Sequence, residues 1–279
     1  MSTPVASESC LERTQWFQLG VICAASFVVW SGFGVILPYL PVFLQEQAHA
    51  SVWLIGVVAA FYYVGTFAFS APLGRLSDSI GRKPVIVAGV SLYALATLLF
   101  VTTTHPGWFI LFRFLEGVGA AAVNPAGMAL VADLSTEDCR SRAYGWLTTA
   151  QFGGLVAGPV LAVPLYNLGG GQGVWAFYTI FLFGSALSAL TAVVLLFVIK
   201  EPEHARRRRA VKVKHPPYRK LITRPIIAFL VVAFTGHLAM GMWEVIWSLW
   251  LRHLGASMTF IGFTWVAFSA PMLFSFVGG

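Results

Sequence analysis

The residues Gly74-Arg-Leu-Ser-Asp78-Ser-Ile-Gly81-Arg82-Lys83 are the strongest indication of the fold class, because they form a short charged segment between two long uncharged ones. Neither residues 47–74 nor residues 84–112 contain a Lys, Arg, Asp or Glu. About 20 apolar residues cross the ~30 Å hydrocarbon core of a bilayer as a helix, and both segments exceed that length. We therefore predict two membrane-spanning helices joined by a tight charged hairpin. Glycines would form its bends, and Pro84 would lie in the first turn of the second helix.

The composition agrees with a membrane protein. Hydrophobic residues make up 58% of the chain and charged residues 10%, and the mean hydropathy is +0.78. These values exclude an ordinary soluble domain. The three cysteines, at positions 10, 23 and 139, have neither metal-binding nor disulfide spacing, so we expect no metal site.

Uncharged runs, cut at Gly, Pro and polar clusters, predict an all-α membrane protein with eight spanning helices. The run from residue 143 to residue 199 is too long for one crossing, so the glycine-rich residues 169–173 must form a turn. The predicted helices cover residues 16–44, 50–73, 84–104, 107–133, 143–168, 173–199, 225–251 and 257–278.

The positive charges predict the orientation. If the N-terminus is cytoplasmic, sixteen of the 18 Lys and Arg residues lie in cytoplasmic segments, as membrane proteins prefer. Arg252 would then face outside, and Arg113 lies within a span. The basic residues of segment 200–224 would meet anionic lipid headgroups rather than nucleic acid. We expect a multi-pass protein of the plasma or inner membrane.

The charged segment resembles the signature G-x-L-a-D-r-x-G-r-k of the major facilitator superfamily. In that family it lies between the second and third helices of each six-helix half. The resemblance implies two halves that rock about a central site. Residues 1–199 would be the complete N-terminal half, 200–224 a cytoplasmic linker, and 225–279 the first two helices of the C-terminal half, so that the chain is a truncated monomer. The matching residues are Gly74, Leu76, Asp78, Gly81, Arg82 and Lys83.

The first predicted helix contains Gly34-Val-Ile-Leu-Pro38-Tyr-Leu-Pro41, which is similar to the G-x-x-x-P-x-x-P stretch of drug–proton antiporters. Two prolines in one turn remove two backbone donors and bend a helix, which lets it line a cavity. The alternative is a frayed helix end.

The fourth predicted helix contains Arg113-Phe-Leu-Glu116-Gly117-Val-Gly119-Ala-Ala121, which resembles the family pattern R-x-x-q-G-x-g-a-a with Glu116 in place of Gln. At 100° per residue, Arg113, Glu116 and Asn124 share one face. Glu116 would lie roughly 13 Å from the outer helix end. A charge at that depth needs a partner or a watery cavity. The pair is either a proton-coupling site or a silent i, i+3 ion pair.

The fifth predicted helix contains Gly145, Gly154 and Gly158-Pro159 at the spacing of the antiporter pattern g-x8-G-x3-G-P-x-x-G-G. Ala162 and Val163 replace the last two glycines. Gly154 and Gly158 share a face that permits close helix approach. In the family this pattern accompanies export rather than uptake.

The resemblance also implies a charge cluster that closes the cytoplasmic side. Asp133, at the end of the fourth helix, would join Asp78 and Arg82 of the charged segment in this latch. The alternative is a set of solvated charges that contributes little.

The seventh predicted helix places His237, Gly241, Glu244 and Ser248 on one stripe, which should point into the bundle. His237 would lie near mid-depth, either as a proton carrier or as a structural residue, with Glu244 nearer the outside. The following residues Trp243, Trp247 and Trp250 form either an interfacial belt or a substrate platform.

We therefore predict a secondary transporter, not an enzyme, that exports small lipophilic compounds by alternating access in exchange for protons, with no cofactor beyond the proton gradient. The proton-coupling candidates are Glu116, Arg113, His237 and Glu244. An aromatic wall would receive the substrate. Its candidates are Trp30, Phe33, Tyr62 and Tyr63, with Asn124 beside them. The alternatives are a sugar or metabolite exporter or symporter, and an inert fragment. An intramembrane enzyme is disfavoured because the sequence contains neither His-Glu-x-x-His nor Gly-x-Ser-x-Gly.

Overall fold

The computed structural model describes residues 12–199 and 223–277, all of which are helical or in short connections. The predicted linker lies almost wholly outside the described residues. The helices are α1 (Arg13–Ile36), α2 (Leu40–Glu46), α3 (Val52–Ile80), α4 (Arg82–Leu99), α5 (Trp108–Leu134), the 3-10 turn η1 (Glu137–Cys139), α6 (Arg140–Leu168), α7 (Gly173–Val198), α10 (Arg224–His253) and α11 (Met258–Val277).

Six helical segments in the described part of the chain are long and apolar enough to cross a bilayer. These are α1 with α2, α3, α4, α5, α6 with η1, and α7. They match the six spans predicted before residue 200, which we call the six-helix half. The helices α10, of 30 residues, and α11, of 20 residues, follow as the two predicted beyond it. The all-α membrane fold is thus confirmed.

The first predicted span is divided by a bend. Helix α1 ends at Ile36, and the separate α2 begins at Leu40. Pro38 and Pro41 lie at this break and offer no backbone N–H to continue the helix. Because Leu40 to Leu44 are all buried, this segment is a packed bend and not a frayed end.

The prediction of a hairpin with two glycine bends is wrong for Gly74. Helix α3 continues through Gly74 to Ile80, and only Gly81, with a φ of 124°, turns the chain. A single glycine weakens a helix by about 1 kcal/mol without breaking it. Gly81 adopts a φ that other residues rarely reach. Lys83 and Pro84 then lie in the first turn of α4, as expected for Pro84.

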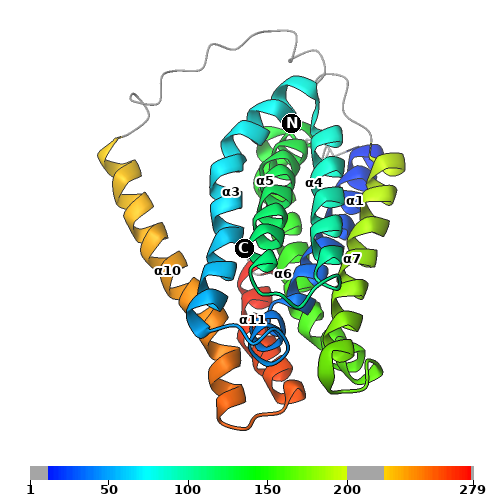
Figure 1. Ribbon diagram of the computed structural model, residues 1–279. Coiled ribbons are helices and arrows are strands. Elements are labelled where there is room, and N and C mark those ends of the chain that lie inside the picture. The colour runs from blue at the N-terminus through cyan, green and yellow to red at the C-terminus, as the bar shows by residue number, and fades with distance from the viewer. Residues whose placement is uncertain (1–11, 200–222, 278–279) are drawn as a thin grey trace, which may run out of the picture.

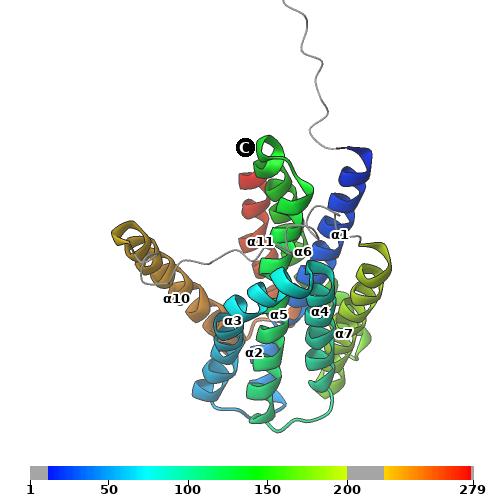
Figure 2. The same ribbon diagram turned by 90° about the horizontal axis from the view of Figure 1, so that it is seen from above.

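Figures 1 and 2 show the six-helix half as a bundle in which α5 lies beside α3 and α4. Helix α1 packs along α6, and α11 packs on the other side of α6. We call the end of the bundle that contains Gly81 the turn end, and the opposite one the α2 end. Helix α10 meets the bundle at the α2 end and diverges from it towards the turn end (Figure 1).

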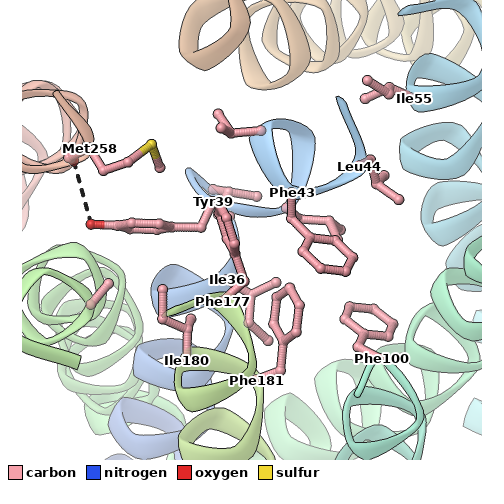
Figure 3. Close-up of a cluster of buried hydrophobic side chains, with 14 of the residues drawn as sticks. Ile36, Tyr39, Phe43, Leu44, Ile55, Phe100, Phe177, Ile180, Phe181 and Met258 are labelled. Atoms are coloured by element: carbon pink, nitrogen blue, oxygen red, sulfur yellow. Dashed lines mark hydrogen bonds between the residues drawn. The ribbon is translucent and has the colours of Figure 1, made fainter. Parts of the chain in front are cut away.

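Two buried apolar clusters fill the bundle. At the α2 end, aromatic rings from four helices meet around Phe43, whose ring centroid lies 5.2 Å from that of Phe181 and 5.5 Å from that of Phe109 (Figure 3). The other cluster, from Leu19 to Ile199, lies towards the turn end. Buried charged residues belong to neither cluster.

The contact between α1 and α6 depends on glycine. A Cβ atom on Gly158 would lie 2.4 Å from the carbonyl carbon of Gly34, and one on Gly154 would lie 2.2 Å from the carbonyl oxygen of Phe27. The close approach expected from the pattern is therefore present. At Gly145, in contrast, no atom lies within 4 Å of such a Cβ.

Candidate functional site at the centre of the bundle

The site is built on α5, where Arg113 and Glu116 lie one turn apart. Arg113 Nη1 donates to Glu116 Oε2 at 2.8 Å. The Thr97 hydroxyl, on α4, donates to the other carboxylate oxygen at 2.6 Å. The Arg113 side chain is 2% exposed and that of Glu116 0%, so both charges are removed from solvent.

A second carboxylate reaches the same guanidinium from α10. Glu244 Oε1 lies 3.6 Å from Arg113 Nη2, and Tyr63, on α3, donates its hydroxyl to Glu244 Oε2 at 2.5 Å. The ion pair predicted within α5 is therefore part of a larger cluster. The contact places Glu244 level with Arg113, and within α10 it lies nearer than residue 237 to the end at His253.

Tyr62 completes the enclosure of Arg113. The guanidinium carbon lies 4.6 Å from the centroid of the Tyr62 ring, which is the geometry of a cation–π contact. This arrangement requires α3 and α5 to lie close together. Gly117 permits it, because a Cβ atom there would lie 2.1 Å from the carbonyl oxygen of Tyr62.

The charges of this cluster do not balance when all three groups are ionised. One guanidinium faces two carboxylates, and the three side chains are at most 11% exposed. An unbalanced charge is expensive in a low-dielectric interior. A single proton on either carboxyl group would make the cluster neutral.

Four of the five predicted substrate residues line one cavity of about 30 Å³. These are Trp30, Phe33, Tyr62 and Asn124. Tyr63 does not line it and instead binds Glu244. A neighbouring cavity of about 30 Å³ shares Trp30 and Asn124 and extends to Gln151 and Ile199. Neither cavity is lined by a charged residue.

The predicted latch residues also come together, at the turn end. Arg82 contacts Asp78 through Nη1, and its Nε lies 3.4 Å from Asp133 Oδ2. Arg82 also donates to the Ser77 hydroxyl at 2.9 Å. All of these contacts lie within the six-helix half.

The tryptophans of α10 do not form a simple belt. Trp243 stacks on Phe268 of α11 with a centroid separation of 4.0 Å, and Trp247 donates its indole N–H to Thr264 at 3.0 Å. Only Trp250, 51% exposed, is placed as a belt residue would be. The side chain of His237 lies outside the described part of the structure.

Sequence reasoning missed one partner of the central cluster, Thr97, and one of its contacts. Thr97 carried no signal, because a hydroxyl residue in a membrane helix commonly bonds to its own helix backbone. The contact between Glu244 and Arg113 joins residues far apart in the chain, and no local spacing encodes it.

Comparison with known proteins identifies the family. The model of the Major Facilitator Superfamily matches residues 22–279. The chain belongs to the Major Facilitator Superfamily. The superfamily consists of multi-span membrane transporters, and the helical bundle described above has that architecture.

Relatives within the superfamily include two resistance proteins. Multidrug resistance protein 2 of Bacillus subtilis is 30% identical over 240 residues, which are 84% of this chain and 58% of the relative. Tetracycline resistance protein, class E, of Escherichia coli is 28% identical over 247 residues, 86% of this chain and 58% of the relative. The chain thus spans a little over half the length of these relatives.

Solved structures share the superfamily fold at low sequence identity. A bacterial homologue of the human lysosomal transporter Spinster, in an inward-facing and occupied conformation, has a TM-score of 0.76 at 17% identity, covering 94% of this chain and 59% of that one. A D-xylose-proton symporter has a TM-score of 0.65 at 13% identity, covering 92% and 66%.

Proposed function

We propose that the protein is a secondary active transporter that exports small lipophilic compounds in exchange for protons. The observation that carries this proposal is the position of Arg113 between Glu116 of the six-helix half and Glu244 of α10. One guanidinium can neutralise only one of two carboxylates, so the second favours binding a proton.

The geometry links that proton to the arrangement of the helices. Glu244 reaches Arg113 only while α10 stays against α3 and α5. If α10 moves away, Arg113 keeps Glu116 as its partner, and Glu244 loses both Arg113 and Tyr63. Proton affinity therefore differs between the two arrangements, which is the condition for coupling a proton gradient to alternating access.

The lining of the central cavity and the relatives support a lipophilic substrate. Trp30, Phe33 and Tyr62 offer aromatic faces, with Asn124 as a polar contact among them. A sugar would need many more hydrogen-bonding groups. The relatives named for multidrug and tetracycline resistance are consistent with this choice, as is the Gly154–Gly158–Pro159 pattern on α6.

The proposal is tested with purified protein in liposomes that carry an imposed pH gradient. We expect uphill movement of a lipophilic dye that stops when the gradient is dissipated. Glu244→Gln and Glu116→Gln should each abolish the gradient-driven component, because a proton can no longer bind there. Glu137→Gln, in the exposed turn η1, is the control and should leave transport intact. Gradient-driven transport of xylose without dye transport would instead identify a sugar transporter, and unchanged dye export by both variants would remove these carboxyl groups from the mechanism.

A further inference from the structure

Tyr93, on α4, has a buried hydroxyl that the proposed function does not use. The residue is 4% exposed, and its hydroxyl oxygen makes no hydrogen bond to any described residue. A buried hydroxyl without a partner is unusual, because its desolvation is not compensated. Such a hydroxyl is suited to binding a water molecule or to a role in the mechanism.

The surroundings of Tyr93 offer both a cavity that can hold water and neighbours that belong to the central site. Its side chain lines the aromatic cavity together with Asn124 and Tyr62. Glu116, Tyr62 and Arg113 act electrostatically on its hydroxyl, and the Thr97 side chain interacts with it directly. Thr97 follows one helical turn later on the same face of α4, and its hydroxyl already donates to Glu116 at 2.6 Å.

The cavities are suited to water. A water molecule needs about 10–15 Å³ of free volume and several polar neighbours. Each cavity offers about 30 Å³, and the polar side chains along them include Tyr93, Tyr62, Asn124, Gln151 and Ser26. Since no charged residue lines either one, they fit water rather than an ion. The second cavity reaches Ile199, just beyond the last residue of α7, and so leads towards the turn end.

We propose that Tyr93 and Thr97 form a proton relay between Glu116 and water in these two cavities, inside the six-helix half. The inference rests on the proposed proton exchange and adds the path that the proton takes between Glu116 and water. A proton leaving Glu116 passes to Thr97 Oγ1, whose own hydroxyl proton passes to Tyr93 Oη. The hydroxyl proton of Tyr93 then passes to water. Each hydroxyl gains and loses one proton, and Glu116 is left as the carboxylate that Arg113 and Thr97 bind in the structure.

Three other titratable groups near the relay do not offer the same path. Glu244 on α10 and Tyr63 on α3 bind each other on the far side of Arg113. Arg113 itself remains charged and paired with Glu116. The route through Thr97 therefore starts from the carboxylate oxygen that Arg113 does not occupy.

The test uses the protein in liposomes with a pH-sensitive dye inside, and compares proton movement driven by substrate with substrate counterflow, which moves no net protons. Thr97→Val and Tyr93→Phe should each slow proton movement roughly a hundredfold, the scale of a lost proton-transfer group, while counterflow stays within about twofold of wild type. Thr97→Ser keeps the hydroxyl and should retain the wild-type rate.

Ser188→Ala is the matched control, because Ser188 also has a buried hydroxyl without a described partner but lines neither cavity. It should change nothing. Wild-type proton movement in both Thr97→Val and Tyr93→Phe would overturn the relay while leaving the proposed function intact, and equal slowing of counterflow would make these residues structural. Absence of substrate-driven proton movement in the wild-type protein would overturn the proposed function and the relay together.

Discussion

The α10–α11 pair contacts the six-helix half differently at the two ends of the bundle. At the α2 end, Arg252 binds Glu46 at 2.5 Å, and Tyr39 donates to the carbonyl oxygen of Met258 at 3.5 Å (Figure 3). At the turn end, every described side chain of residues 223–240 is exposed, and Arg82 bonds only within the six-helix half among the described residues.

Under the proposed export by alternating access, this difference identifies the contacts that would change. The α2 end is closed by an ion pair and a buried apolar cluster that includes Val245 and Leu249 of α10. The turn end is open between α3 and α10. Arg113 and Glu244 lie between the two, where a tilt of α10 would alter their separation. The proposed alternating access would require the α2 end to separate when the turn end closes.

Gly158→Leu should have the strongest effect, because it disrupts the close packing of α1 against α6, on which both ends of the bundle depend. A side chain at this position would force α1 away from α6. Helix α1 leads into α2, and α11 packs against α6, so both neighbours would be displaced. Overpacking costs about 1–3 kcal/mol or more where the obstacle is backbone. We expect loss of folded protein, measured as a lower unfolding temperature and aggregation on size exclusion.

Gly145→Leu is the matched control, since the same glycine pattern leaves open space there. It should unfold at the wild-type temperature. An equal fall in unfolding temperature in both variants would show that the close contact at Gly158 is not the cause of the destabilisation.

A smaller effect is expected from reversing the charges that close the α2 end. Arg252→Glu or Glu46→Arg alone places like charges together and should favour separation of α10 from α2. The two side chains are about one third exposed, so we expect about 1 kcal/mol, or roughly a fivefold rise in the labelling rate of a cysteine placed at the buried position Ala48.

The double reversal, Glu46→Arg with Arg252→Glu, restores an attractive pair and should return labelling towards the wild-type rate. Failure of the double variant to recover would mean that the ion pair does not hold this end closed.

The smallest effect is expected from Asp78→Asn at the turn end. This end is already open in the structure, and the Asp78 side chain is 51% exposed. Loss of its charge removes a contact that Asp78 makes with Arg82 in this open arrangement, so it should favour closure of the turn end slightly, by up to about 1 kcal/mol. Labelling of a cysteine at the exposed position Ser141 should fall by about twofold, and labelling at position 48 should rise in proportion.

Ser79→Ala, in the same turn, is the control and should leave both labelling rates unchanged. A change at position 141 without the opposite change at position 48 would show that the two ends are not coupled.

Much of the fold could be predicted because the bilayer imposes local rules. A helix that satisfies its own backbone hydrogen bonds needs a certain apolar length, so the uncharged runs located the spans, with ends that differ from the structure by at most seven residues. The pair of Arg113 and Glu116 followed from i, i+3 spacing, and the approach of α1 to α6 from the spacing of Gly154 and Gly158. The turn was misplaced because Gly74 and Gly81 look alike in sequence, whereas only Gly81 has the backbone conformation that needs glycine.

The central site could be predicted only in part. Candidates such as Glu116, Glu244 and Tyr62 were recognisable one by one, because polar groups in apolar helices rarely lie there without a partner. Their assembly around one guanidinium could not be predicted. The sequence around Thr97 and Tyr93 also contained nothing that indicated the surroundings of their hydroxyl groups.

The order of residues is enough to identify a membrane protein of the Major Facilitator Superfamily, because hydrophobic length and a charged signature between spans are properties of contiguous residues. Three features emerge only from the packing of the helices: Arg113 is shared by two carboxylates, Tyr63 binds Glu244, and α10 contacts the six-helix half at one end. These features depend on helix crossing and tilt. Packing between residues far apart in the chain sets such angles, and no periodicity within one helix specifies them.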